Sequence, residues 1–109
     1  MDAEQAVNQI LDDEGLAGDL DEAEATVLTN WLVGEVQKIA KQATTDEAGW
    51  KRIKERKQLA RKIAHAVALF RDEGLVQASQ YAKAEQLKWP TPPPANQKQA
   101  LEQLLHSVK

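Results

Sequence analysis

The sequence predicts an all-α protein, a small bundle of about four to five helices built around a long antiparallel helical hairpin. The composition supports this class, because Ala, Gln, Glu, Lys and Leu are abundant and glycine is sparse, at 5 of 109 residues. The apolar residues also recur at helical spacing, without the alternation of a half-buried strand. A chain of this length can form one domain with its own hydrophobic core.

The N-terminal half is expected to contain two helices. The first runs from about residue 3 to residue 14 and stops at Gly15. The second begins near Asp19 or Asp21, either of which can cap the free N–H groups, and continues to about residue 43. Its apolar stripe consists of Leu28, Trp31, Leu32, Val36 and Ile39.

A third and longer helix follows. Thr44 and Glu47 have the spacing of a capping box at its start, and Gly74 marks its end. Residues 21–43 and 46–73 would then form the two arms of the hairpin. In such a hairpin, residues whose numbers sum to about 90 lie opposite each other, because both helices rise equally per residue.

The C-terminal part is expected to hold two shorter helices. A fourth helix over about 75–87 must end at the proline-rich segment 89–95, since proline cannot continue a helix. Asn96 can cap a last short helix. The apolar face of that helix would be Leu101, Leu104, Leu105 and Val108. We therefore divide the chain into a helical bundle (1–88), a linker (89–95) and a C-terminal helix (96–109), and the sequence leaves open whether the first and last helices pack on the hairpin.

Charge is divided unevenly along the chain. Residues 1–50 hold 12 acidic and 2 basic side chains, whereas residues 51–109 hold 5 acidic and 12 basic side chains. The hairpin register places the acidic start of the second helix beside Arg71, and it places the basic run opposite residues 28–39, where Glu35 is the only acid. The two charged poles are thus too far apart to neutralise each other, which indicates another helix or another molecule as the source of counter-charge.

The basic run of the third helix is the candidate partner-binding surface. Arg52 and Arg56 fall within the apolar sector of a helical projection, so we expect them to face a neighbouring helix or an interface. A solvated outer face is the ordinary explanation of a charge run, but the near absence of interleaved acid favours an anionic partner. The candidate surface consists of Lys51, Arg52, Lys54, Arg56, Lys57, Arg61, Lys62 and His65.

Residues that carry catalysis or hold metals are missing from the sequence. It contains no cysteine, and neither His65 nor His106 has the spacing of a metal ligand or of a catalytic triad. The acidic residues near the first turn do not follow the pattern of a calcium loop. We therefore expect no catalytic residues, no enzymatic activity, no cofactor and no metal site.

The favoured function is a non-catalytic protein-binding or assembly subunit that uses a charged helical surface, with self-association through opposite poles as one version. The alternative is a nucleic-acid-binding module, or a ribonucleoprotein component, that uses the basic face 51–62.

Trp50 and Trp89 are candidate aromatic anchors for a partner, besides their ordinary role in packing. The acidic start and the absence of a long apolar run lead us to expect a cytoplasmic protein that does not contact membranes.

Overall fold

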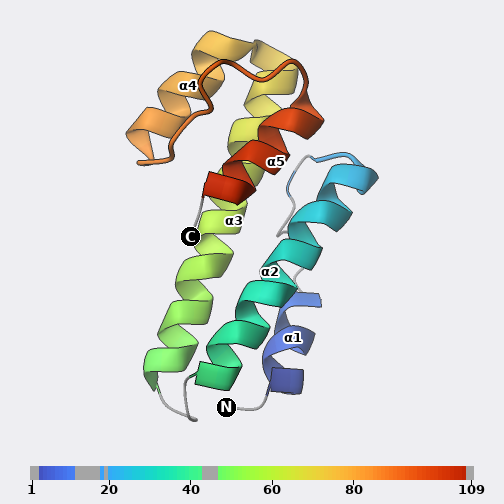
Figure 1. Cartoon of the computed structure of the whole chain (residues 1–109), viewed down its shortest axis with the longest axis vertical. Coiled ribbons are helices and arrows are strands. Elements are labelled where there is room, and N and C mark those ends of the chain that lie inside the picture. Colours follow the sequence, from blue (N-terminus) through green and yellow to red (C-terminus); the bar gives the residue numbers. More distant parts are fainter. Residues whose placement is uncertain (1–2, 12–17, 19, 43–46, 108–109) are drawn as a thin grey trace.

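The computed structural model of the chain is built from five helices, shown in Figure 1. They are α1 (Ala3–Leu11), α2 (Glu22–Gln42), α3 (Glu47–Glu73), α4 (Leu75–Ala84) and α5 (Gln97–Ser107). The structure describes residues 3–11, 18, 20–42 and 47–107, and none of these residues lies in a strand. The prediction of an all-α fold with four to five helices is confirmed.

The helices are arranged around α2 and α3, which contact each other and run in opposite directions (Figure 1). The first helix, α1, packs on α2, and α4 packs on α3. The last helix, α5, contacts both α2 and α3. The first and last helices thus both pack on the central pair, a point that the sequence left open.

The hydrophobic core lies between α2, α3 and α5 and is closed on one side by α1. From α2, the core takes most of the predicted stripe, whereas Trp31 is only partly buried. From α5, it takes the predicted leucines, each of which contributes roughly 1.5–3 kcal/mol by leaving water. Val108 lies outside the described residues. The large core side chains are Ile10, Leu28, Leu32, Val36, Ile39, Ile53, Ile63, Val67, Leu101, Leu104 and Leu105.

The corner between α3 and α4 is a single residue, Gly74. Its φ of 98° lies in the region that favours glycine. The Gly74 N–H donates to the Leu69 carbonyl at 3.1 Å, and its carbonyl accepts the Ala78 N–H at 3.2 Å. The same residue therefore ends one helix and starts the next, so the predicted end of the long helix at Gly74 is confirmed. The capping box predicted at Thr44 lies outside the described residues.

The fourth helix ends at Ala84, three residues earlier than predicted. The Leu87 N–H donates to the Ala82 carbonyl at 2.7 Å, and the Gln86 N–H donates to the Lys83 carbonyl at 3.2 Å. This pair of bonds is the Schellman pattern that ends a helix, and it requires a left-handed residue, here Gln86 with a φ of 62°. The prediction missed this end because it relied on glycine and proline as stop signals.

The start of α2 is tied to α3 and α5 through Asp21. Its carbonyl accepts the Ala25 N–H at 2.8 Å, as an N-cap residue does. Its carboxylate, which we expected to cap the helix, instead accepts a hydrogen bond from Gln97 Nε2 at 2.6 Å and lies 3.5 Å from Arg71 Nη1. The pairing with Arg71 agrees with the predicted position of the acidic residues. Asp19, the other predicted cap, lies outside the described residues.

Gln97 at the start of α5 also holds the buried carboxylate of Glu24. Its Nε2 donates to Glu24 Oε1 at 2.9 Å, in addition to the bond with Asp21. The helix is capped as predicted, because Asn96 Oδ1 accepts the Gln99 N–H at 2.8 Å. One amide group therefore links the N-terminal turns of two helices that are far apart in the sequence.

We expect Gln97→Glu to destabilise the protein more than Gln97→Ala. Removing the amide leaves the buried Glu24 without its donor, at a cost of about 1–3 kcal/mol. A carboxylate at residue 97 adds repulsion from Asp21 and Glu24 at close range. Urea unfolding monitored by circular dichroism measures both losses, and equal stability of the wild-type and Glu variants would contradict this role of Gln97.

Gln86→Gly is expected to raise the free energy of unfolding by about 1 kcal/mol, because glycine adopts the left-handed conformation without steric cost. The matched control is Gln80→Gly at an exposed position inside α4, which should lower stability by about 1 kcal/mol. Thermal unfolding of both variants provides the comparison. Destabilisation by both substitutions would show that residue 86 is not left-handed in solution.

Candidate interaction surface

Two of the predicted surface residues are used in the contact between α3 and α4. Lys62 Nζ lies 3.4 Å from Glu85 Oε2 at the end of α4. The imidazole of His65 meets the ring of Tyr81 edge-on, with 4.4 Å between the ring centroids. The C-terminal end of the basic run therefore helps to hold α4 in place.

The N-terminal part of α3 presents the exposed members of the basic run. Lys51, Arg52 and Lys54 are exposed, and we refer to these three residues as the basic patch. In the part of the chain that the structure describes, no carboxylate lies within 4.0 Å of their charged groups. Lys57 is half-buried and Arg61 is exposed further along the same helix. The basic patch is thus a concentration of positive charge at one end of the molecule.

The two arginines expected to face a neighbour behave differently. Arg56 is half-buried and lines a groove together with Glu35 of α2 and Glu102 of α5, as expected for a residue in the apolar sector. Arg52 is exposed and therefore does not face a neighbouring helix of the same chain, so of the two expected environments only an interface with a partner stays a prediction. Arg56 shares its groove with the last turn of α5, and Arg52 lies one helical turn beyond it, where α5 no longer covers α3.

The tryptophan next to the basic patch is partly accessible. Trp50 packs against the hydrophobic core with part of its ring and is half-buried. It lines a shallow cavity of about 270 Å³ together with Ile53, Lys54 and Lys57. An aromatic ring and an aliphatic side chain therefore lie directly beside the positive charges.

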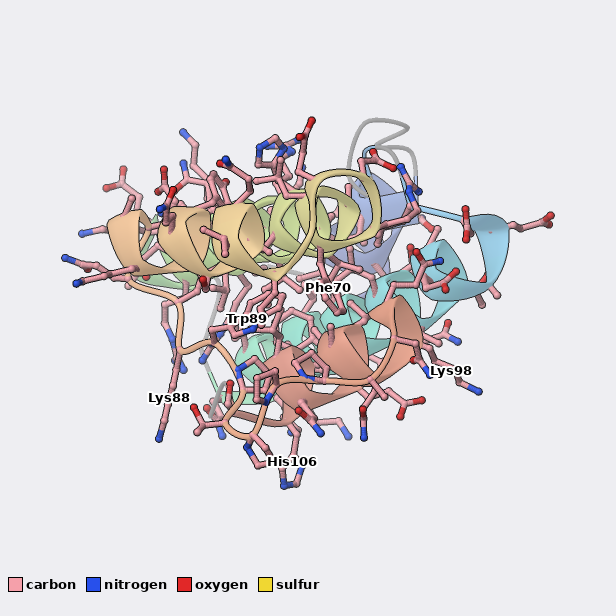
Figure 2. All side chains as sticks on the ribbon, turned by 90° about the horizontal axis from the view of Figure 1, so that it is seen from above. Phe70, Lys88, Trp89, Lys98 and His106 are labelled. Atoms are coloured by element: carbon pink, nitrogen blue, oxygen red, sulfur yellow. The ribbon has the colours of Figure 1, made fainter. Side chains whose placement is uncertain are left out.

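The other candidate anchor, Trp89, is held by packing on the distal half of α3. Its ring meets Phe70 edge-on, with 5.5 Å between the centroids and an interplanar angle of 77°. Both residues are half-buried, and Figure 2 shows their rings between the helices, while Lys88 and His106 point outward. The Trp89 Nε1 group is buried and has no acceptor among the described residues. Contacts with apolar neighbours thus position this ring.

Sequence reasoning missed two grooves that flank α5. The first, of about 700 Å³, lies between α2, α3 and α5, and the second, of about 680 Å³, separates α5 from the segment 88–92. Glu102 and His106 line both grooves, and Trp31 lines the first. These grooves could not be predicted without knowing where α5 packs. The one hint in the sequence is Trp31, a large side chain in the apolar stripe of α2, which the structure leaves only half-buried.

The opposite end of α3 carries negative charge and exposed apolar side chains. Asp72 and Glu73 are exposed at the end of the helix, and Leu75 and Val76 follow with exposed fractions of 38% and 64%. We refer to these four residues as the acidic corner. Arg71 binds Asp72 through Nε at 2.8 Å and Nη2 at 3.0 Å. These hydrogen bonds hold the pKa of Asp72 below its usual range, and they keep its carboxylate ionised.

Comparisons with protein-family models, with curated proteins and with solved structures give no match for this chain. Within the described ranges, no helix is both long and apolar enough to cross a membrane. Nor do His, Asp and Glu side chains gather there in a group of three that could hold a metal ion.

The contact of α4 with α3 is expected to make stability depend on pH in the alkaline range. Burial raises the pKa of Tyr81, and the negative charge of Glu85 raises it further. The unfolded chain then loses the phenol proton at lower pH than the folded chain does, so this stabilisation is present below about pH 10 and is lost as pH rises through the folded-state pKa.

Absorbance of the tyrosinate form measures this shift directly, because Tyr81 is the only tyrosine in the sequence. We expect a titration midpoint above 10.0 in the folded protein and a lower midpoint in urea. Tyr81→Phe should reduce the loss of stability above pH 10. Identical midpoints in the folded and unfolded states would contradict the burial of the phenol.

Proposed function

We propose that this protein is a non-catalytic protein-binding or assembly subunit, and that the basic patch at the start of α3 binds an acidic protein surface. One observation carries the proposal: three cationic side chains are exposed within four positions, without an acidic partner in the described structure. Like charges so close together repel each other, and an anionic partner relieves that repulsion.

The surroundings of the basic patch favour a protein as the partner. Trp50 and Ile53 line a cavity that is shared with Lys54, so positive charge and apolar surface lie side by side. Protein interfaces combine a partly apolar centre that includes aromatic residues with a polar rim. A partner that presents both a carboxylate and an aliphatic side chain would satisfy both features at once.

We also propose how the helices hold the basic patch in position. We take α2 and α3 to act as a hairpin, with α4 and α5 covering the half of α3 that is distant from the basic patch. The single core shared by α2, α3 and α5 supports a rigid presentation of the charged residues. We further propose that the protein acts in the cytoplasm.

The second candidate is nucleic-acid binding through the same helix. Lys51, Arg52, Lys54 and Arg61 are all exposed, and a helix can place such residues along a phosphate backbone. If these four residues contact phosphates, the logarithm of affinity should fall against the logarithm of salt concentration with a slope of about −3.6. The net charge of −3 and the acidic corner weigh against this candidate, because both repel phosphates.

A charge-reversal variant of the basic patch provides the test. We expect Lys51→Glu, Arg52→Glu and Lys54→Glu together to abolish partner capture in a pull-down from the native host, without changing helicity. The matched control reverses three exposed lysines elsewhere, namely Lys83, Lys88 and Lys98. It introduces the same change in net charge and should leave capture intact.

Nuclease treatment of the extract separates the two candidates. Proteins that the wild type and the control capture after nuclease treatment, and that the patch variant loses, support protein binding. Material that disappears on nuclease treatment supports the nucleic-acid candidate instead. Capture of the same partners by the patch variant and the wild type would refute both candidates, because neither would then depend on the basic patch.

A further inference from the structure

We infer that the acidic surface bound by the basic patch is the acidic corner of a second copy of this chain, in a two-fold antiparallel dimer. This inference rests on the proposed function and names its partner. In the dimer, the start of α3 in one protomer meets the end of α3 in the other. The same contact therefore forms twice, as two-fold symmetry requires.

The two surfaces are complementary in charge and in apolar character. The basic patch lies beside the cavity formed with Trp50 and Ile53. The acidic corner offers Asp72 and Glu73 next to an aliphatic side chain, Val76, which is 64% exposed. Glu73 forms no ion pair within the described part of the chain. The two surfaces thus carry opposite charges, and each presents apolar side chains beside its charged groups.

The spacing along α3 allows both contacts to form simultaneously. Lys54 and Asp72 are 18 residues apart, which is about five helical turns, so they lie on the same side of the helix and about 27 Å from each other. A two-fold axis near residue 63, midway between them, brings Lys54 of each protomer to the level of Asp72 of the other.

The shape of the molecule fits this arrangement. Figure 1 shows α4 projecting beside the distal half of α3, whereas the N-terminal half of α3 has no helix on that side. In the antiparallel dimer, α4 of each protomer lies beside the uncovered N-terminal half of the other protomer's α3. A parallel dimer would instead place basic patch against basic patch, so charge also selects the orientation.

Sedimentation velocity of the intact chain at high concentration tests this inference. We expect a species of twice the 12.1 kDa chain mass at about 50 mM salt, and a shift toward monomer at about 1 M salt, where charges are screened within about 3 Å. Val76→Asp should weaken the dimer while leaving the basic patch unchanged. A chain that stays monomeric at low salt would overturn the inference.

A charge-exchange experiment identifies the contact itself. Variant A carries Lys51→Glu and Lys54→Glu, and variant B carries Asp72→Lys and Glu73→Lys. Each variant alone places like charges opposite each other at both contacts, so it should be monomeric while its circular dichroism spectrum remains that of the folded wild type. An equimolar mixture of A and B restores opposite charges at both contacts and should form a heterodimer.

The outcomes also separate this inference from the proposed function. If the mixture of A and B stays monomeric, the acidic corner is not the partner of the basic patch, and the inference fails. The proposed function still stands in that case if the basic patch captures a different protein after nuclease treatment. Restored association in the mixture supports both.

Discussion

The packing of α5 against both α2 and α3 is the interaction on which the rest of the structure depends. Leu101 and Leu104 are almost completely buried in the core shared by the three helices, and each contributes roughly 1.5–3 kcal/mol. At the start of the helix, Gln97 joins α5 to the first turn of α2 through Asp21 and Glu24. Asp21 in turn pairs with Arg71 at the end of α3. One end of the bundle is therefore held by apolar burial and by a connected polar network.

This packing determines which charged residues remain on the surface. The last turn of α5 lies in the groove that Arg56 lines, and α4 engages Lys62 and His65. Closer to the N-terminus of α3, Lys51 and Lys54 stay exposed. The two ends of α3 thus differ in charge, with Lys51 and Lys54 exposed near its start and Asp72 and Glu73 exposed at its end. A molecule with opposite charges at its ends is suited to assembly with a different protein or with a second copy of the same chain.

The sequence allowed prediction of those features that depend on residues close together in the chain, such as helix positions, helix ends and helix caps. Helical spacing of apolar residues located the elements, Gly74 marked the end of α3, and Asn96 marked the cap of α5. The end of α4 was missed because glutamine seldom adopts the left-handed conformation that Gln86 has there. The role of Asp21, the exposure of Arg52 and the grooves beside α5 depend on contacts between residues far apart in the sequence, and periodicity carries no information about these.

Hydrogen exchange of the intact chain, resolved by mass spectrometry, tests most directly whether α5 is an integral part of the bundle. Amides in residues 100–107 should exchange as slowly as those of α2 around Leu32 and those of α3 around Ile63, since all three segments open together when the shared core opens. Exchange of residues 100–107 at the rate of an unfolded peptide, with α2 and α3 still protected, would contradict the packing from which the exposed basic patch follows.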